Sequence, residues 1–416
     1  MTTSETAIDA LFGDDVVQDP HEYYRYLREN DPVHEVEGTG TYVVTRMELI
    51  HEIVADTDTY SSAASNYLHL GDWSRPGLRP AMTGLTEGAT GSAVATTDPP
   101  DHSRQRQVVS RRLSPRNVEA LGAQFRELVT NVLTEVEPSG SCEWMSRVAE
   151  PLPMVMVTRV LGLADELAPQ LKKQGYAMVE RISGFVPEPR IPELEDEGVN
   201  GLAPVIDAYM QAKEDAFAYE NGLIGIVKQA VDEGELNDLE AFGILSVIIA
   251  AGGESTTSLL GTAARVLAER VDLQDQLRAD PTLIPNFVEE ALRYDPPFRG
   301  HYRVVTRDTA LGGKTIPAGS QLLLAWPGAN RDDAMYDGPD EFRLDRPRPR
   351  FHVGFGWGIH LCVGAPLARL EAKVAIETLL ARTRRFTLDP EQLPLRYHPS
   401  LVVRRLTSLP LLVEPA

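Results

Sequence analysis

A single cysteine lies in a glycine-rich stretch near the C-terminal end of the sequence, directly before a helix pattern. The stretch reads FGWGIHLCVG and contains Cys362. The glycines around it are Gly354, Gly356, Gly358 and Gly364. Because glycine has no Cβ and tolerates positive φ, the backbone here can lie close to a bulky group. A helix start offers free N–H groups that stabilise a thiolate. The pattern therefore favours a metal ligand, or a nucleophile with His360 as its base, over the buried structural cysteine that is commoner in general.

Helix patterns dominate the chain, and short strand patterns lie toward its ends. Apolar residues recur at three- and four-residue intervals in stretches that begin at Ser114, Leu239 and Ala365. Short apolar runs predict strands at residues 41–46, 302–307, 321–326 and 401–403, and GGKTIPAGSQ predicts a hairpin turn between two of them. We expect a mainly α fold with a smaller β-rich part, organised as one domain over residues 1–416.

Charge and cysteine content exclude several classes of protein. The net charge of -21 opposes nonspecific nucleic-acid binding, which needs cationic side chains against the phosphates. Cys142 and Cys362 form no C-x-x-C pair, which excludes a zinc ribbon and a disulfide scaffold and is typical of a reducing, cytoplasmic compartment. No run approaches about 18 uninterrupted apolar residues, and the first residues are polar and acidic. We therefore expect neither a membrane span nor a secretory signal.

The cysteine stretch and the helix pattern after it match a long family signature. The segment FGWGIHLCVGAPLARLE resembles the haem-binding signature of the cytochrome P-450 superfamily, Phe-Gly-x-Gly-x-His-x-Cys-x-Gly followed by Ala-Arg-x-Glu. The resemblance extends over almost the whole chain and is to soluble, bacterial-type members. It implies the cytochrome P-450 fold, haem b (iron protoporphyrin IX) as cofactor, and Cys362 as the proximal thiolate ligand of its iron. It also implies that Phe355 packs against the haem. The backbone N–H groups after the cysteine, among them that of Gly364, are implied to hydrogen-bond the sulfur and tune the reduction potential.

A Glu-x-x-Arg pair belongs to the same resemblance. The spacing places Glu290 and Arg293 on one helix face, where an ordinary surface ion pair is the alternative. The resemblance implies a structural role instead, with Arg346 of FRLDR as the third member of a group that holds the cysteine loop in place.

Four further residues resemble the family's contacts to the two haem propionates. His102 and Arg106 lie one helical turn apart in DPPDHSRQRQVV, which by itself is also typical of a solvated helix start. Arg303 and His360 are similar to the remaining propionate contacts.

Two adjacent glycines stand inside the long apolar helix pattern, in AAGGESTTS. Gly252 and Gly253 each cost roughly 1 kcal/mol relative to alanine, so they serve either an opening of the helix ladder or close helix packing. The segment resembles the family's oxygen-binding groove, with Glu254 as the acid and Ser255 where threonine is usual. Thr256 offers a second hydroxyl, which helix geometry turns about 100° away. Serine lacks the γ-methyl that fixes a threonine rotamer, so we expect oxygen activation to be retained with increased uncoupling.

The substrate pocket implied by the resemblance is mainly apolar and suits a hydrophobic or aromatic small molecule. Its expected walls are Val247, Ala250, Ala251, Phe298, Arg299, Val402 and Val403. Arg299 can bind a carboxylate or phenolate of the substrate, but a propionate contact or a turn to solvent is favoured.

The activity implied by the resemblance is that of a haem-thiolate monooxygenase, which inserts one oxygen atom of O2 into its substrate by hydroxylation or O-dealkylation. No flavin or NAD fingerprint occurs, so we expect electrons from a separate ferredoxin and ferredoxin reductase. Candidate docking residues are Arg104, Arg111, Arg112 and Lys373. The alternatives are a peroxide-driven haem peroxygenase, against which Glu254 and Ser255 argue, and a non-catalytic haem sensor. We expect a monomer without nucleic-acid or membrane partners.

Overall fold

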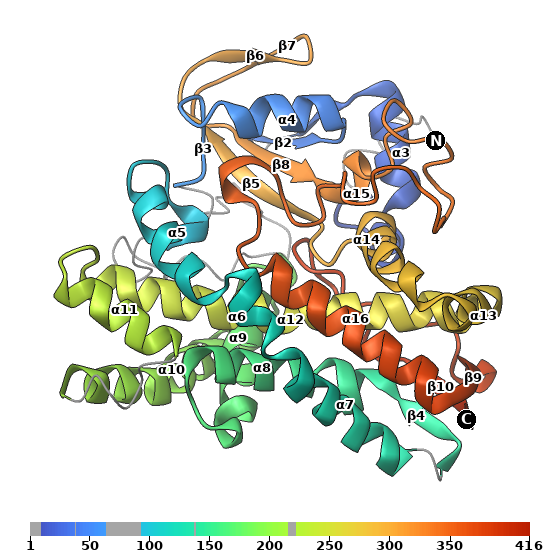
Figure 1. Ribbon diagram of the computed structural model, residues 1–416. Helices are drawn as coiled ribbons and strands as arrows, with labels where there is room; N and C mark the ends of the chain where they lie inside the picture. The colour runs from blue at the N-terminus through green and yellow to red at the C-terminus, as the bar shows by residue number, and fades with distance from the viewer. Residues whose placement is uncertain (1–9, 38, 64–92, 137–138, 215–221) are drawn as a thin grey trace.

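The chain forms a large helical part and a smaller part built around a β-sheet (Figure 1). The computed structural model describes residues 10–37, 39–63, 93–136, 139–214 and 222–416. Its α-helices are α2 Asp14–Gln18, α3 His21–Asn30, α4 Met47–Ala55, α5 Asp101–Arg112, α6 Pro115–Glu119, α7 Gly122–Val136, α8 Pro151–Leu161, α9 Ala168–Arg181, α10 Ile191–Glu214, α11 Leu223–Asp232, α12 Asp238–Glu269, α13 Val271–Ala279, α14 Ile284–Tyr294, α15 Trp326–Ala329 and α16 Ala365–Arg382. Its strands are β1 Val33–Val36, β2 Thr41–Val44, β3 Tyr60–Ser61, β4 Ser141–Glu143, β5 Gly300–Val305, β6 Thr309–Leu311, β7 Lys314–Ile316, β8 Gln321–Ala325, β9 Thr383–Leu388 and β10 Pro410–Pro415.

The strands form three sheets. The largest has the order β1-β2-β8-β5-β3, in which β2 and β8 are parallel and the other neighbours antiparallel. It carries an apolar core shared with α4. A second sheet has the order β4-β10-β9, and β6 and β7 form a hairpin. The main sheet and α4 lie above the helical part in the view of Figure 1, so β5 and β8 reach toward the middle of the molecule.

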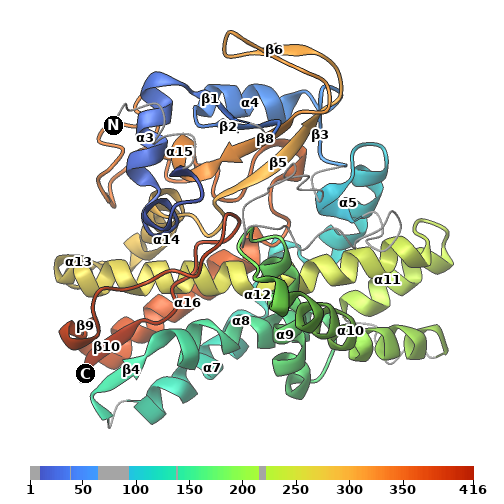
Figure 2. The ribbon, with the colours of Figure 1, turned by 180° about the vertical axis from the view of Figure 1, so that it is seen from behind.

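Helix α12 is the central element of the helical part and spans its width, as the view from behind shows (Figure 2). It begins at a capping box, in which the side chain of Asn237 accepts from the N–H of Glu240 and Glu240 accepts from the N–H of Asn237. Helices α8, α9 and α16 pack against it. Within the described residues, α12 is the one helix long and apolar enough to cross a membrane. However, 61% of its most apolar 18-residue window is buried inside the protein, as in a core helix.

The structure confirms the predicted mainly α architecture and changes some predicted boundaries. The stretch from Ser114 forms two helices, α6 and α7, instead of one, while α12 and α16 follow their patterns closely. Predicted strands at 41–46, 302–307 and 321–326 correspond to β2, β5 and β8. The stretch predicted as a hairpin turn, residues 312–321, contains the tight turn between β6 and β7, but β7 itself lies inside it and was not predicted. The strand expected at 401–403 is wrong, because this segment makes only one isolated bridge, between Val403 and Phe298.

Candidate active site

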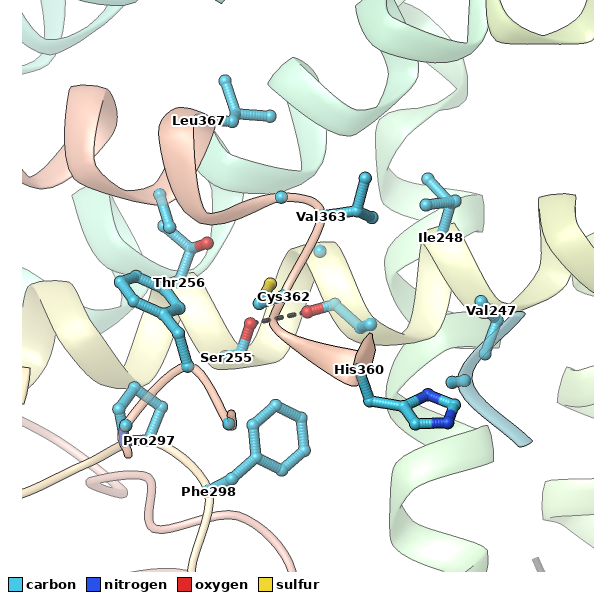
Figure 3. Close-up of a pocket in the computed structure, with 18 of the residues that line it drawn as sticks. Val247, Ile248, Ser255, Thr256, Pro297, Phe298, His360, Cys362, Val363 and Leu367 are labelled. Atoms are coloured by element: carbon cyan, nitrogen blue, oxygen red, sulfur yellow. Dashed lines mark hydrogen bonds between the residues drawn. The ribbon is translucent and has the colours of Figure 1, made fainter. Parts of the chain in front are cut away.

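A cavity lies where α12, the loop before α16, the strand β5 and the start of α15 meet. Its walls include Ser255 and Thr256 on α12, and Cys362 on the loop. Figure 3 shows these residues with Phe298 and Val247 around the same space. Most of the lining is apolar, which is typical of a site for a large apolar ligand with a few polar contacts.

The loop that carries Cys362 is shaped by its glycines. Gly356 and Gly358 adopt φ values of +71° and +69°, a region that side chains disfavour. The turn is closed by a hydrogen bond of 2.9 Å from the Cys362 N–H to the carbonyl oxygen of Phe355. Helix α16 begins three residues later, at Ala365. The cysteine is thereby held at the cavity wall, immediately before a helix N-terminus.

The sulfur of Cys362 is surrounded by groups of opposite effect. Burial raises the pKa of the Cys362 thiol above its ordinary value. The N–H groups of Gly364 and Ala365 and the guanidinium groups of Arg106 and Arg369 lower it in part. These donors and cations favour a thiolate, and the cysteine is exposed where it lines the cavity. The arrangement suits a thiolate ligand to a metal centre inside the cavity.

A buried ion-pair network stands behind the loop. Arg293 on α14 donates two hydrogen bonds of 2.8 Å to Glu290, and Nε of Arg346 lies 3.0 Å from both oxygens of the same carboxylate. The structure therefore brings all three predicted residues together. Arg293 also donates to the carbonyl oxygen of Asn330, whose side chain accepts from the N–H of Val353 in the loop. The network is thus linked to the cysteine loop through Asn330.

A second buried carboxylate, missed by the sequence interpretation, connects the loop to α16. Glu289 accepts from Arg369 at 2.6 Å and from the ring of His352 at 3.0 Å. Burial opposes its charge, but these bonds outweigh the burial and hold the pKa of Glu289 below its usual range. The guanidinium of Arg369 also lies 4.5 Å from the centre of the Phe355 ring. Glu289 adjoins the Glu-x-x-Arg pair, but nothing in the sequence indicates its distant partners.

Two histidines and two arginines gather near Cys362, and the histidine rings have buried nitrogens without hydrogen-bond partners among the described residues. The rings of His102 and His360 lie 4.2 Å apart, and the buried nitrogens His102 Nδ1 and Nε2 and His360 Nε2 bond to none of the described residues. Burial lowers the pKa of His360 to about 3, with Arg303 the next cause, and lowers that of Arg303 to about 10. Arg106 donates to the carbonyl oxygen of Leu361, at 2.6 Å. Orphaned donors and desolvated cations of this kind fit the carboxylates of an anionic ligand, as the two propionates of a haem would require.

The α12 wall of the cavity carries Ser255 and Thr256, whereas Glu254 is not part of the lining. The Ser255 hydroxyl donates to the carbonyl oxygen of Ala251 at 2.5 Å, drawn as a dashed line in Figure 3. Both Ser255 and Thr256 line the cavity, although helix geometry predicted that Thr256 would turn away. Burial raises the pKa of Glu254, while a bond of 2.9 Å from Arg405 lowers it in part. Arg405 comes from the C-terminal segment and was not predicted.

The adjacent glycines of α12 serve helix packing. A Cβ on Gly252 would lie 2.7 Å from Val157, and one on Gly253 would lie 2.4 Å from Met154, both on α8. Helix α12 runs without interruption from Asp238 to Glu269. Of the two explanations left open by the sequence, the structure supports close packing.

The predicted pocket residues divide into two groups. Val247, Ala251 and Phe298 line the cavity. Ala250, Val402 and Val403 are buried in an adjoining apolar cluster with Val179, and Phe298 packs against that cluster. Ala250, Val402 and Val403 were expected in the lining, but they lie behind it and support the cavity wall through Phe298.

The expectation for Arg299 is wrong. Its guanidinium donates to the backbone carbonyl oxygens of Val16 and Val17 at the end of α2. The side chain is almost completely buried there. It faces neither the cavity nor solvent, because its role is to satisfy carbonyl groups that a helix end leaves free.

The basic residues considered for partner docking are mostly engaged within the chain. Arg104 pairs with Glu240 at 2.7 Å, and Arg111 pairs with Glu235 at 2.8 Å. Lys373 lies 3.6 Å from Glu377. Arg112 has a buried Nε without a hydrogen-bond partner among the described residues. The four residues therefore do not form a free cationic surface.

Comparisons with known proteins identify the family. The Cytochrome P450 family model matches residues 205–409. Cytochrome P450 144 of Mycobacterium tuberculosis is 36% identical over 417 residues, covering 100% of this chain and 93% of that protein. Cytochrome P450 monooxygenase PikC of Streptomyces venezuelae is 30% identical, covering 99% and 95%. The solved structure of cytochrome P450 CYP109Q5 from Chondromyces apiculatus has a TM-score of 0.84 at 27% identity, covering 98% of each chain. With relatives of this similarity along its whole length and the P450 fold around the cavity, the chain belongs to the cytochrome P450 family of monooxygenases.

Proposed function

We propose that this protein is a haem-thiolate monooxygenase that inserts one oxygen atom of O2 into an apolar or aromatic small molecule, by hydroxylation or O-dealkylation. The observation that carries the proposal is that Cys362, on the loop before α16, and Ser255, on α12, line one mainly apolar cavity, which the histidines and arginines of the predicted propionate site also line in part. The bound cofactor, haem b, supplies the activation of O2.

The residues of the chain have separate tasks in this proposal. Cys362 holds the iron, and the N–H groups of Gly364 and Ala365 stabilise its thiolate. The propionates are held by His102, Arg106, Arg303 and His360. The network of Glu290, Arg293 and Arg346 keeps the loop in position without taking part in the chemistry.

Proton delivery is assigned to the α12 side. Ser255 and Thr256 each present a hydroxyl at the cavity wall, and Glu254 lies behind them with a raised pKa, so it holds a proton more readily than an ordinary glutamate. In this scheme Glu254 is the proton reservoir and Ser255 Oγ the last donor. Apolar side chains around the cavity exclude water and orient the substrate.

Electrons are proposed to come from a ferredoxin and its reductase, with the enzyme acting as a monomer in the cytoplasm. A substrate is first identified as a compound that shifts the spin state of the haem when it binds. Turnover of that substrate then tests this assignment. With ferredoxin, reductase and NADH, we expect product in proportion to the NADH consumed. Turnover with peroxide alone but not with the reductase system would identify a peroxygenase, and substrate binding without product in either system would identify a sensor.

A further inference from the structure

A tryptophan and a histidine are hydrogen-bonded to each other in the cavity wall. His301 lies on β5 and Trp326 directly follows β8, and the two strands pair so that His301 stands opposite Leu324. Nε1 of Trp326 lies 2.8 Å from Nδ1 of His301. Both residues line the cavity. Neither was predicted as a site residue, because the contact depends on the pairing of two strands that are distant in the sequence.

This hydrogen bond determines where the histidine carries its proton. The indole N–H is only a donor, so Nδ1 of His301 must be the acceptor. Burial lowers the pKa of His301 to about 4, with Arg303 as the second cause, so the ring is neutral near pH 7. A neutral imidazole with an acceptor at Nδ1 carries its hydrogen on Nε2. Trp326 therefore fixes His301 as a hydrogen-bond donor at Nε2.

The Nε2 atom of His301 donates to no acceptor among the residues that the structure describes. His301 retains exposed surface, although protein encloses it deeply enough to lower its pKa. His301 is part of the cavity lining, so its ring is within reach of a molecule that fills the cavity. The ring of Phe298 lies 4.9 Å away, centre to centre, so the donor is set in an apolar wall.

A donor of this kind favours one class of ligand. An apolar molecule without an acceptor would leave the N–H unsatisfied once water is displaced, which costs binding free energy. An apolar molecule with a suitably placed oxygen would satisfy it. We propose that His301 is a specificity-determining residue that donates from Nε2 to a carbonyl oxygen of an otherwise apolar substrate, and that Trp326 is its positioning residue. This proposal rests on the proposed function, because it assigns the polar contact of the same substrate site.

A matched pair of probes tests the assignment on the haem-loaded enzyme. The probes are 4-phenylcyclohexanone and phenylcyclohexane, which differ by a single carbonyl oxygen. Their dissociation constants are measured by calorimetry for the wild-type enzyme and for His301→Phe, Trp326→Phe and Phe298→Leu. For each variant we take the ratio of the two dissociation constants and compare it with the wild-type ratio. The different water solubilities of the probes affect every ratio equally and cancel in this comparison.

His301→Phe is expected to lower the preference for the ketone by about tenfold, because the donor is lost while an aromatic ring of similar size remains. Trp326→Phe should lower the preference less, because the donor is still present but its tautomer is no longer fixed. Phe298→Leu alters the wall without removing a donor, so both probes should weaken together and the ratio should stay unchanged.

An unchanged ratio in both His301→Phe and Trp326→Phe would overturn the proposal. An equal loss for both probes in His301→Phe would also overturn it, since His301 would then act on the shape of the cavity or on a haem carboxylate near Arg303. Trp326→Phe provides an independent result should His301→Phe not fold. Binding is measured without turnover, so a failure of the monooxygenase assignment appears in the spectra and product assays and remains distinguishable from a failure here.

Discussion

The two faces of the cavity are built in different ways. On the cysteine side, backbone hydrogen bonds and buried ion pairs hold the loop of Cys362, and the carboxylates of Glu289 and Glu290 each have more than two partners. On the α12 side, the side chains of Ser255 and Glu254 each have one hydrogen-bond partner among the described residues. The cysteine side is held by several interactions at each residue, whereas the α12 side consists of side chains that can change partners. We infer that changes on the cysteine side affect folding and cofactor retention, and that changes on the α12 side affect the reaction.

The largest expected effect is on the cysteine side. Glu290→Gln removes the charge shared by Arg293 and Arg346, which are both buried. Breaking a buried ion pair in this way costs about 3–5 kcal/mol, so the free energy of unfolding should fall by that order and haem should be lost. Urea unfolding and the haem absorbance of the purified protein measure both effects.

A matched control is Arg384→Ala, which breaks the exposed pair of Arg384 with Glu414. Its effect on the free energy of unfolding should stay within about 0.5 kcal/mol. If Glu290→Gln is as mild as this control and keeps its haem, the cysteine side is not held by the network.

The next effect is on the hydroxyls of α12. Ser255→Ala should leave the free energy of unfolding nearly unchanged but reduce product formed per NADH by at least about tenfold, because the last proton donor is removed. Ser255→Thr should keep or improve this ratio, since threonine carries the same hydroxyl with a more restricted rotamer. Product and NADH are measured in the same assay.

Thr256→Ala separates the two hydroxyls, since both line the cavity. A smaller loss than in Ser255→Ala supports the assignment of Ser255. If neither Ser255 variant changes the coupling of NADH to product, or if Thr256→Ala has the larger effect, the proton path has been placed on the wrong residue.

The smallest expected effect is a shift in the pH dependence of the coupling of NADH to product. Proton donation from Glu254 is lost as the pH rises through its pKa. Burial raises this pKa, Arg405 lowers it, and the nearby charges of Glu180 and Glu150 raise it. Arg405→Gln removes a cation, so the pKa of Glu254 should rise and coupling should persist to higher pH. The measurement is coupling of NADH to product as a function of pH.

Glu150→Gln provides a control of opposite sign. Glu150 shares Arg405 with Glu254, so its neutralisation removes a like charge and leaves Arg405 to Glu254 alone. The pH at which coupling of NADH to product is lost should then fall. Arg405→Lys keeps a cation at this position, so its pH profile should lie closer to that of the wild-type enzyme than the profile of Arg405→Gln does. A profile that moves in the same direction in Arg405→Gln and Glu150→Gln would contradict the role of Glu254.

The difference between the two faces also explains what could be predicted from sequence. The helices α12 and α16 have long apolar periodicities, so local pattern was sufficient to predict them. The roles of the cysteine loop and of the Glu290–Arg293 pair came from the resemblance to the family signature, since the spacing of the pair alone is equally typical of a surface ion pair. Arg405, His301 and Trp326 acquire their roles from tertiary contacts between distant segments. Arg299 was misplaced for the same reason, since its partners are carbonyl groups more than 280 positions away. The glycines at 252 and 253 have two physical explanations, and only the position of α8 distinguishes them.

The assignment of Cys362 as the thiolate ligand of a haem can be tested by the reduced carbon monoxide spectrum of the protein. The chain has two cysteines, so Cys142→Ser is the matched control for Cys362→Ser. Cys142 is buried on β4, and it does not line the cavity. The haem-loaded wild-type protein and Cys142→Ser should both give the spectrum of a thiolate-ligated haem, and Cys362→Ser should lose it. A thiolate spectrum that survives in Cys362→Ser, or that is absent from the haem-loaded wild-type protein, would contradict the account.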